Sequence, residues 1–245
     1  MSKLRRFHVF SLNGLNPNDA VRLPEDEAKH ARVLRLEQDT EIEIFDDHGF
    51  HVRAHLTGDS AKLIGMPQIP TTPTRHLTLG LSWPKGKRAA ILVEKCSELG
   101  VNRIVPIKYL RSVVSKRDES EGIVRLRRIA SEAAKQSGRH DVPEIAEEIS
   151  FTQVLDETSH GFSVMLDPAA EMQFATILAD SDTTVPVFLL VGPEGGFSAE
   201  EIQAAEARAI RRARLAANVL RVETAAIAAC AIFQGIKGGW NNRGL

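Results

Sequence analysis

Two loops in the last third of the sequence hold the residues best suited to chemistry. The first is the Gly-Pro-Glu-Gly-Gly loop at residues 192–196, which directly follows the apolar run at 187–191. Ser198 and Glu201 have the spacing of a capping box, which predicts that a helix begins there. A glycine-rich loop between a strand and a helix is a common small-molecule site in α/β proteins, so we expect a ligand at this loop.

The composition of this first loop restricts its ligand. A P-loop needs a lysine after the glycines and a dinucleotide loop needs the pattern GxGxxG, and neither pattern occurs here. Glu194 would repel a phosphate, whereas a carboxylate favours a ligand with positive charge or with hydroxyl and amino donors. A structural alternative stays open, in which Glu194 stabilises the helix dipole and the glycines form a tight turn.

The second loop lies at residues 215–229 and reads "LAANVLRVETAAIAA". Arg221 and Glu223 are its only charged residues, and an apolar helical pattern follows them. Thr224 is predicted to be the N-cap of that helix. Charged groups beside apolar walls can orient a substrate. The alternative is a structural ion pair between Arg221 and Glu223 next to a helix cap.

The segments around these loops alternate between strand and helix patterns. Apolar strand patterns at 76–83, 103–110, 162–168 and 187–192 are separated or followed by helical patterns at 87–100, 122–138 and 222–236. Gly100 and Gly138 are predicted to end the first two of these helices. Such alternation predicts an α/β domain with a mostly parallel sheet over residues 71–245.

The first 70 residues have a different texture. Short segments at 5–10, 40–47, 50–58 and 61–66 alternate partly between apolar and polar residues, which predicts strands. A helical turn is expected at 24–36, which starts with proline and acidic residues. These elements predict a small β-barrel over residues 1–70. The stretch "GMPQIPTTPTR" at 65–75 is predicted to be an extended linker.

The bulk composition is that of an ordinary globular protein. Of the 245 residues, 43% are hydrophobic and 26% are charged, and no apolar run approaches the roughly 18 residues of a membrane span. The two cysteines have no CxxC spacing, which argues against a disulfide framework and against a zinc site. This cysteine content fits a reducing cytoplasm. His48, His51 and His55 do not share one strand face, and we predict no metal site.

Net charge is −1, so the composition alone does not indicate a nucleic-acid partner. Basic residues nevertheless gather in clusters at 5–6, 32–35, 111–117, 125–128 and 208–214. Each cluster alone is typical of a solvated helix face. Taken together, they favour a phosphate-binding surface.

The two loops together resemble a known family. "LLVGPEGGFSAEEI" at 189–202 followed by "VLRVETA" at 219–225 is similar to the SPOUT methyltransferases, and specifically to the RsmE-type enzymes, which methylate N3 of a uridine in 16S ribosomal RNA. The segments "RRF" at 5–7, "EKCSELGVNRIVP" at 94–106 and "EAAKQSGRHDVPEI" at 132–145 extend the resemblance over nearly the whole chain. The pairing of the two loops is more specific than either loop alone.

This resemblance implies a fold and a cofactor. The fold is a PUA-like barrel followed by an α/β domain whose C-terminal segment is threaded into a trefoil knot, a rare exception to usual chain topology. Members are homodimers that bind S-adenosylmethionine in the knot. The positions that correspond to the family's cofactor contacts are Leu166, Gly192, Pro193, Glu194, Gly195, Gly196, Asn218, Leu220, Thr224 and Ala225.

The resemblance also gives the two charged residues of the second loop a role. Uridine N3 must lose a proton for methyl transfer, so a base or a stabiliser of the resulting anion helps the reaction. We expect Arg221 to stabilise negative charge on the uracil oxygens and Glu223 to accept a proton or orient the base. Ribosomal RNA or the small ribosomal subunit is then the expected partner. Its expected contacts are Arg5, Arg6, Arg32, Arg35, Lys85, Lys87, Arg88, Arg111 and Arg139.

Two departures from the family pattern and two alternatives accompany this reading. Ala216 stands where the family usually has a glycine, which predicts a narrower pocket or a changed backbone angle. His30 lies three residues before Val33, a spacing that differs from the family's and argues against His30 as an RNA contact. The alternative functions are another SPOUT RNA methyltransferase, acting on a ribose 2′-hydroxyl or another base, and a non-catalytic ribosome-assembly factor.

Overall fold

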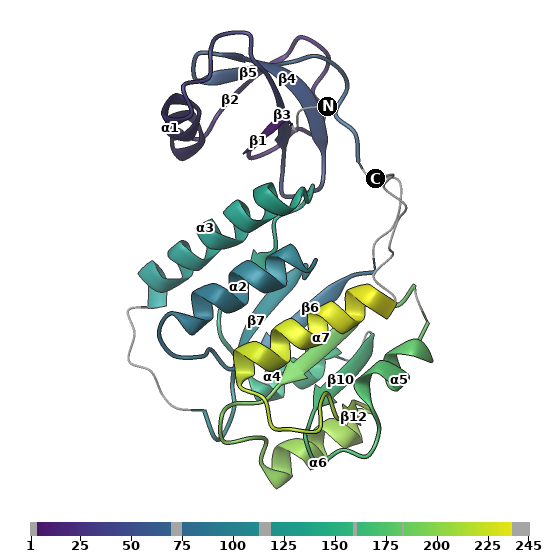
Figure 1. The fold of residues 1–245 in the computed structure, drawn as a ribbon. Helices are drawn as coiled ribbons and strands as arrows, with labels where there is room; N and C mark the ends of the chain where they lie inside the picture. Colours follow the sequence, from purple (N-terminus) through teal and green to yellow (C-terminus); the bar gives the residue numbers. More distant parts are fainter. Residues whose placement is uncertain (1–3, 70–74, 113–118, 159–160, 183, 237–245) are drawn as a thin grey trace. The chain divides into compact units, whose positions relative to one another are not determined.

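The computed structural model describes residues 4–69, 75–112, 119–158, 161–182 and 184–236 (Figure 1). Contacts divide the chain into two compact units, Met1–Pro73 with Ser131–Val142, and Thr74–Ala130 with Pro143–Leu245. The boundary expected at residue 70 stays a proposal. Residues 70–74 of the predicted linker lie outside the described residues.

The smaller unit is built on a five-stranded sheet. Its elements are β1 (Arg5–His8), β2 (Ala20–Arg22), α1 (Glu25–Val33), β3 (Glu41–Phe45), β4 (His51–Thr57) and β5 (Ser60–Leu63). The strand order is β1-β3-β4-β5-β2, with β1 and β3 parallel and the other neighbours antiparallel. Side chains in β3 and β4 alternate between buried and more exposed, as the sequence predicts. The β-rich prediction is thus confirmed, and β2 is a strand that the sequence did not reveal.

Ion pairs reinforce the smaller unit around the segment at 131–142. Lys135 donates a hydrogen bond to Glu27 at 2.6 Å, and both side chains are almost fully buried. Glu43 accepts a hydrogen bond from Arg6 at 2.5 Å and lies 3.6 Å from His140. Burial by itself would raise the pKa of Glu43, but His140 and Arg6 outweigh burial and lower this pKa to about 2.

The larger unit is an α/β domain. Its strands are β6 (Leu77–Leu81), β7 (Arg103–Lys108), β8 (Glu144–Ile145), β9 (Ile149–Ser150), β10 (Phe162–Leu166), β11 (Val187–Val191) and β12 (Arg211–Ala213). Its helices are α2 (Arg88–Glu98), α4 (Phe151–Glu157), α5 (Phe174–Ala179), α6 (Ala199–Ala207) and α7 (Val222–Ile236), and α3 (Glu119–Ser137) joins it to the segment at 131–142. Gly100 and Gly138 both have φ of 82°, which confirms them as helix stops.

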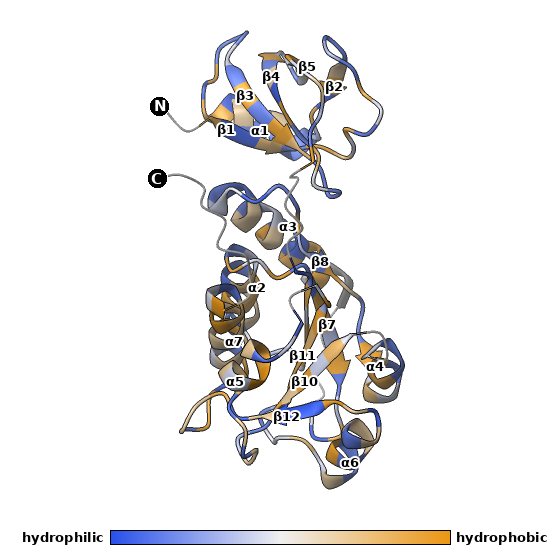
Figure 2. Cartoon of the chain, turned by 90° about the vertical axis from the view of Figure 1, so that its right-hand side faces the viewer, coloured by the Kyte–Doolittle hydropathy of each residue, from blue (hydrophilic) through white to orange (hydrophobic). Residues whose placement is uncertain are grey.

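All recorded strand pairs of this sheet are parallel, in the order β12-β10-β11-β6-β7-β8, with β9 also pairing with β7. Strands β6 and β11 are buried along their whole length. Figure 2 shows why, because α2, α5 and α7 cover one face of the sheet and α4 and α6 cover the other. The predicted mostly parallel sheet is confirmed. The knotted path stays a prediction, because strand order alone does not establish a threading.

The chain places β7 and β8 on one side of β6 and the later strands β11, β10 and β12 on the other. This reversal of strand order creates a crevice at the carboxyl ends of β6 and β11, where open α/β sheets bind ligands. The loop at 192–196 begins at this point. The fold therefore directs attention to one edge of the sheet.

Candidate active site

A cavity of about 730 Å³ opens at the carboxyl edge of the larger unit. The two loops singled out in the sequence, the end of β10 and the first residue of α2 form its walls. The residues lining it are Arg88, Leu166, Asp167, Pro168, Val191, Gly192, Pro193, Glu194, Gly196, Phe197, Leu215, Ala216, Asn218, Val219, Leu220, Arg221, Val222 and Ala225. Two sequence motifs that lie more than twenty residues apart thus share one concave site.

The first loop is held by a turn and a cap. Gly196 has φ of 69° and its N–H donates to the carbonyl of Pro193 at 2.9 Å, which closes the turn. The predicted capping box is confirmed, since the Ser198 hydroxyl accepts from the Glu201 N–H and the Glu201 carboxylate accepts from the Ser198 N–H. The same carboxylate accepts the Leu110 N–H at 2.8 Å. Glu201 therefore ties the loop after β7 to the cavity loop.

Close packing explains the first glycine of this loop. A Cβ at Gly192 would lie 3.0 Å from a ring carbon of Phe197. Phe197 is buried and packs edge-on against Tyr109, with ring centroids 5.3 Å apart. The peptide at Gly192 and the aromatic ring together make one wall of the cavity.

Glu194 does not have the structural role that the sequence left open. Helix α6 begins at Ala199, and the acidic residues of its first turn are Glu200 and Glu201. Glu194 instead extends toward α2, where its carboxylate accepts a hydrogen bond from Arg88 at 3.3 Å. Its side chain keeps 49% of its exposure. A carboxylate at the cavity wall therefore remains open to a ligand.

The structural alternative for the second loop, an ion pair between Arg221 and Glu223, does not hold among the described residues. Among the described residues, no ion pair joins Arg221 to Glu223, because Arg221 is exposed and lines the cavity while Glu223 is 12% exposed and lies 3.7 Å from Arg88. The predicted N-cap at Thr224 is wrong. Helix α7 already begins at Val222, and the carbonyl of Arg221 accepts the N–H of Ala225 at 2.8 Å.

Eight of the ten expected cofactor positions line the cavity, namely Leu166, Gly192, Pro193, Glu194, Gly196, Asn218, Leu220 and Ala225. Gly195 and Thr224 are not among the lining residues. Gly195 faces Arg111 instead, which donates to the Gly195 carbonyl at 3.3 Å and to the Phe197 carbonyl at 3.2 Å. Thr224 is an exposed residue of the first turn of α7.

Sequence reasoning missed several parts of this cavity. Asp167 forms part of the wall, and Arg212 of β12 holds its carboxylate through two hydrogen bonds of 2.6 and 3.0 Å. Ala216, by contrast, was singled out in the sequence; it lines the cavity and is not among the described residues with positive φ, so replacing the family's glycine brings no left-handed strain. Leu215, Val219 and Phe197 had no signal in the sequence beyond their closeness to the two motifs.

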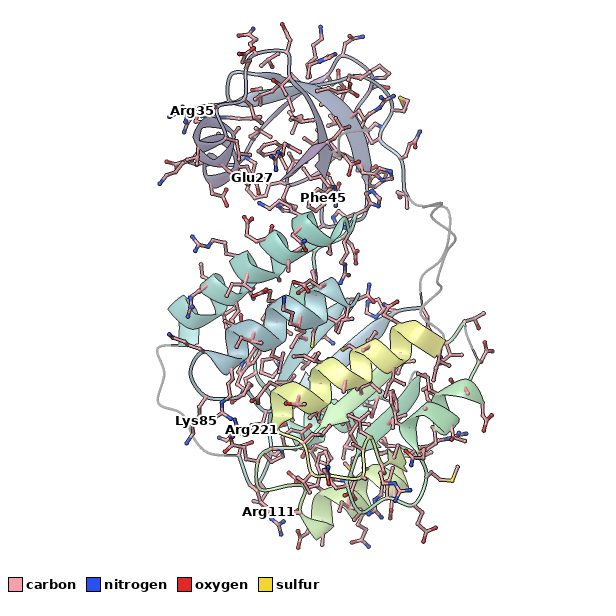
Figure 3. All side chains as sticks on the ribbon, viewed as in Figure 1. Glu27, Arg35, Phe45, Lys85, Arg111 and Arg221 are labelled. Carbon is pink, nitrogen blue, oxygen red and sulfur yellow. The ribbon has the colours of Figure 1, made fainter. Side chains whose placement is uncertain are left out.

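Apart from Arg88, which lines the cavity, the basic residues expected to bind RNA fall into three groups. Arg5, Arg35, Lys85, Lys87 and Arg111 are exposed. Arg32 is exposed but paired with Asp59 at 2.5 Å. Figure 3 labels Lys85, Arg111 and Arg221 at the same end of the larger unit, where the cavity loops lie.

Two of the expected RNA contacts have structural roles instead. Arg6 is 7% exposed, pairs with Glu43 and stacks over the Phe45 ring at 4.6 Å. Arg139 is 11% exposed and pairs with Asp141 at 2.5 Å. Because both guanidiniums are buried in local ion pairs, neither belongs to the proposed RNA surface.

The basic cluster at 208–214 is likewise built into the fold. Arg208 pairs with Asp156 at 3.2 Å, and Arg211 lies over the ring of Phe162 at 5.2 Å. Hydrogen bonding to Asp167 raises the pKa of Arg212, which keeps it fully charged. These local partners agree with the prediction that each basic cluster alone is a solvated face, and the phosphate-binding surface stays a prediction for the clusters together.

The described part of the chain contains no group of three or more His, Cys, Asp or Glu residues arranged to hold a metal ion. His51 stacks on His140 with ring centroids 3.8 Å apart, and His55 contacts the carbonyl of Asp39 at 3.0 Å. A membrane-crossing helix, long and apolar enough for a bilayer, is also not found in the described residues.

Comparison with known proteins agrees with this geometry. The family model described as the RNA methyltransferase domain matches residues 70–234, which is more than half of the chain. The chain belongs to this RNA methyltransferase family. A second model, the RNA methyltransferase PUA domain, matches residues 23–64. The expected PUA-like character of the N-terminal part is thereby confirmed.

Two relatives that match most of this chain have the same protein name. The chain is 28% identical to the ribosomal RNA small subunit methyltransferase E of Aquifex aeolicus, covering 92% of this chain and 98% of that protein. It is also 28% identical to the protein of the same name from Mesomycoplasma hyopneumoniae, covering 81% and 86%.

The solved structures show the same fold. A ribosomal RNA small subunit methyltransferase E from Neisseria gonorrhoeae, bound to S-adenosyl methionine, is 27% identical with a TM-score of 0.83, covering 98% of this chain and 100% of the other. A putative methyltransferase from Legionella pneumophila, also in complex with that cofactor, is 25% identical with a TM-score of 0.82, covering 95% and 98%. The resemblance read from the two loops is thus confirmed over the whole chain.

Proposed function

We propose that this chain methylates N3 of a uridine in 16S ribosomal RNA and takes the methyl group from S-adenosylmethionine. One observation carries the proposal. The loop at 192–196 and the loop at 215–225, which the sequence pairs as a motif, line a single cavity at the carboxyl edge of a parallel sheet. Relatives named small subunit methyltransferase E, one of them bound to this cofactor, support the same assignment.

The chemistry of the cavity fits the cofactor. Its volume of about 730 Å³ lies within the range of small-molecule sites. Leu166, Val191 and Leu220 give the cavity apolar walls that would suit the apolar parts of the cofactor. Glu194 supplies a partly exposed carboxylate for a ligand with a cationic sulfonium and an amino group. Bound there, S-adenosylmethionine supplies an electrophilic methyl group.

The cofactor contacts that we propose are the eight cavity-lining positions of the expected set. The backbone of the 192–196 loop would be able to approach the bound cofactor closely, because its glycines have no side chains in the way. Asn218 offers both hydrogen-bond donors and an acceptor. Gly195 and Thr224 lie in the same loops and support their shape.

The chain's own residues then position the uridine and handle its proton. Arg221 is exposed at the cavity, so its guanidinium can reach the negative charge that develops on the uracil oxygens as N3 loses its proton. Glu223 belongs to the same loop and is 12% exposed; it is not itself a lining residue but lies between the lining residues Val222 and Ala225, and we propose that it accepts this proton or orients the base. If Arg221→Ala and Glu223→Ala both retain the full methylation rate while binding cofactor normally, these roles are wrong.

The RNA contacts that we propose are Arg5, Arg32 and Arg35 on the smaller unit and, separately, Lys85, Lys87 and Arg111 on the larger unit. Lys85 and Lys87 flank Gly86 in an exposed loop just before α2, which suits contact with phosphates. Phosphate contacts release counterions, so RNA affinity must fall as salt rises. A flat salt dependence would contradict these contacts.

The assembly that we propose is a homodimer that works in the cytoplasm, where the ribosome is made. Helix α7 is rich in alanine and isoleucine, and Ala231 and Ile236 are exposed on it, as expected of a helix that packs against a second copy. Sedimentation equilibrium at micromolar concentration tests this state, and a monomer at every concentration would refute it.

Methyl transfer from labelled cofactor tests the function itself. Ribosomal RNA and assembled small subunits serve as substrates, and digestion of the product identifies the modified nucleoside. N3-methyluridine supports the proposal, whereas a 2′-O-methyl nucleoside or another modified base supports the second SPOUT activity. A chain that binds RNA but shows no heat of cofactor binding in calorimetry is a non-catalytic assembly factor.

A further inference from the structure

Arg88 stands apart from the other basic residues of the expected RNA-contact set. Within that set and the described residues, it is the member that lines the cavity. Its Nη1 atom contacts two carboxylates, Glu194 Oε1 at 3.3 Å and Glu223 Oε1 at 3.7 Å. One guanidinium therefore joins the loop after β11 to the first turn of α7.

The two carboxylates need this cation. One oxygen of each carboxylate contacts the same nitrogen, Nη1 of Arg88. Glu194 and Glu223 are therefore close enough to repel each other when both are ionised. Glu223 is also mostly buried, and its second oxygen, Oε2, is buried without a hydrogen-bond partner in the described structure. A carboxylate with one oxygen paired and the other free is oriented yet still able to accept a hydrogen bond.

Helix energetics do not explain an arginine at this place. Arg88 is the first residue of α2, where the helix dipole disfavours a cation, and the first turn of α2 contains no acidic residue. Helix α2 packs against α7, and Cys96 of α2 and Cys230 of α7 are both buried free cysteines. The packing of these two helices brings Arg88 to Glu223.

We propose that Arg88 is a positioning residue. It holds the Glu223 carboxylate in place for the reaction at the cavity and keeps the Glu194 carboxylate next to that of Glu223. This inference rests on the proposed methyl transfer. It gives Arg88 a task different from that of the RNA-contacting lysines beside it, because Arg88 acts through Glu223 and not through a phosphate.

A double-mutant cycle at saturating cofactor tests the proposal. The variants are Arg88→Gln, Glu223→Gln and the double variant, with kcat, KM for RNA and cofactor affinity measured for each. We expect Arg88→Gln to lower kcat about tenfold with little change in KM for RNA, and to add little to the loss already caused by Glu223→Gln. Arg88→Lys, which retains the charge, should restore part of the rate.

Arg103 offers a matched control. It also bridges two glutamates, Glu144 at 3.2 Å and Glu157 at 2.6 Å, and its side chain is 28% exposed against 34% for Arg88. It begins β7, however, and so lies at the opposite edge of the parallel sheet from the cavity. Arg103→Gln should leave kcat unchanged.

The outcomes separate this inference from the proposed function. If the decreases in kcat of the two single variants multiply in the double variant, or if Arg88→Gln changes only KM for RNA, then Arg88 contacts RNA directly. Either result would overturn the positioning role. An Arg103→Gln variant as slow as Arg88→Gln would also overturn it. A wild-type chain that transfers no methyl group to ribosomal RNA would overturn the proposed function, and this inference with it.

Discussion

Gly192→Ala is the substitution for which the structure gives the clearest expectation. The new Cβ would lie 3.0, 3.1 and 3.2 Å from three carbons of the Phe197 ring. Ordinary carbon contacts begin at roughly 3.5 Å, so either the ring or the loop has to move. Gly192 is not among the described glycines with positive φ, so the effect comes from lost space and not from backbone strain.

The Phe197 ring has little room to move. It is buried in a cluster with Tyr109, and Tyr109 in turn packs against Phe151 with ring centroids 5.6 Å apart. Extra atoms in such a packed site typically cost about 1–3 kcal/mol. Because Gly192 and Phe197 both line the cavity, we expect the free energy of unfolding to fall by this amount and the cofactor to bind about tenfold more weakly, which corresponds to about 1.4 kcal/mol.

Denaturant unfolding and calorimetry measure the two effects. Gly235→Ala in α7 is the control, because a Cβ there meets nothing within 4 Å, and we expect stability equal to the wild type or up to about 1 kcal/mol higher. Adding Phe197→Leu to Gly192→Ala should recover part of the cofactor affinity, since it removes the ring carbons that clash. Wild-type stability and affinity in Gly192→Ala would refute the reasoning.

Three further predictions concern charged groups. Lys135→Met leaves the Glu27 carboxylate buried without its cation and should lower the free energy of unfolding by about 3–5 kcal/mol, and Glu27→Leu in the same chain should restore most of it in urea titrations. The folded-state pKa of Glu43, about 2 against an ordinary 4.5, implies stability that is complete above pH 4.5 and is lost as pH falls toward 2, by up to about 3 kcal/mol. Glu43→Gln should make the free energy of unfolding less dependent on pH across that range. An unchanged pH dependence would contradict the lowered pKa of Glu43. Glu194→Ala should weaken cofactor binding about tenfold but RNA binding little, whereas equal losses in both titrations would count against a cofactor contact.

The sequence was informative wherever local rules decide structure. Ser198 and Glu201 form the capping box that their spacing predicts, and Gly100 and Gly138 end helices with positive φ. Such features depend on a few neighbouring residues, so they are readable without the fold. The N-cap predicted at Thr224 was wrong, because α7 begins at Val222 and Thr224 lies in its first turn.

The sequence did not reveal short edge strands or the partners of charged side chains. Strand β12 is three residues long and carries Arg211 and Arg212, so its pattern is that of a basic surface and not of a strand. Only its pairing with β10 places Arg212 beside Asp167. In the same way Arg6 and Arg139 resemble RNA contacts until the fold supplies Glu43 and Asp141 as partners.

The two chemical loops, the alternation that makes a parallel sheet and the exclusion of a phosphate-binding motif can be read from the sequence, because they depend on residue types at short spacing. Which residues share the cavity depends on the three-dimensional fold. Arg88 lies 106 residues from Glu194 along the chain, and it meets Glu194 and Glu223 because parallel strands bring their carboxyl ends to one edge and α2 packs on α7. Contacts between residues so distant are set by strand order and helix packing, which no local pattern encodes.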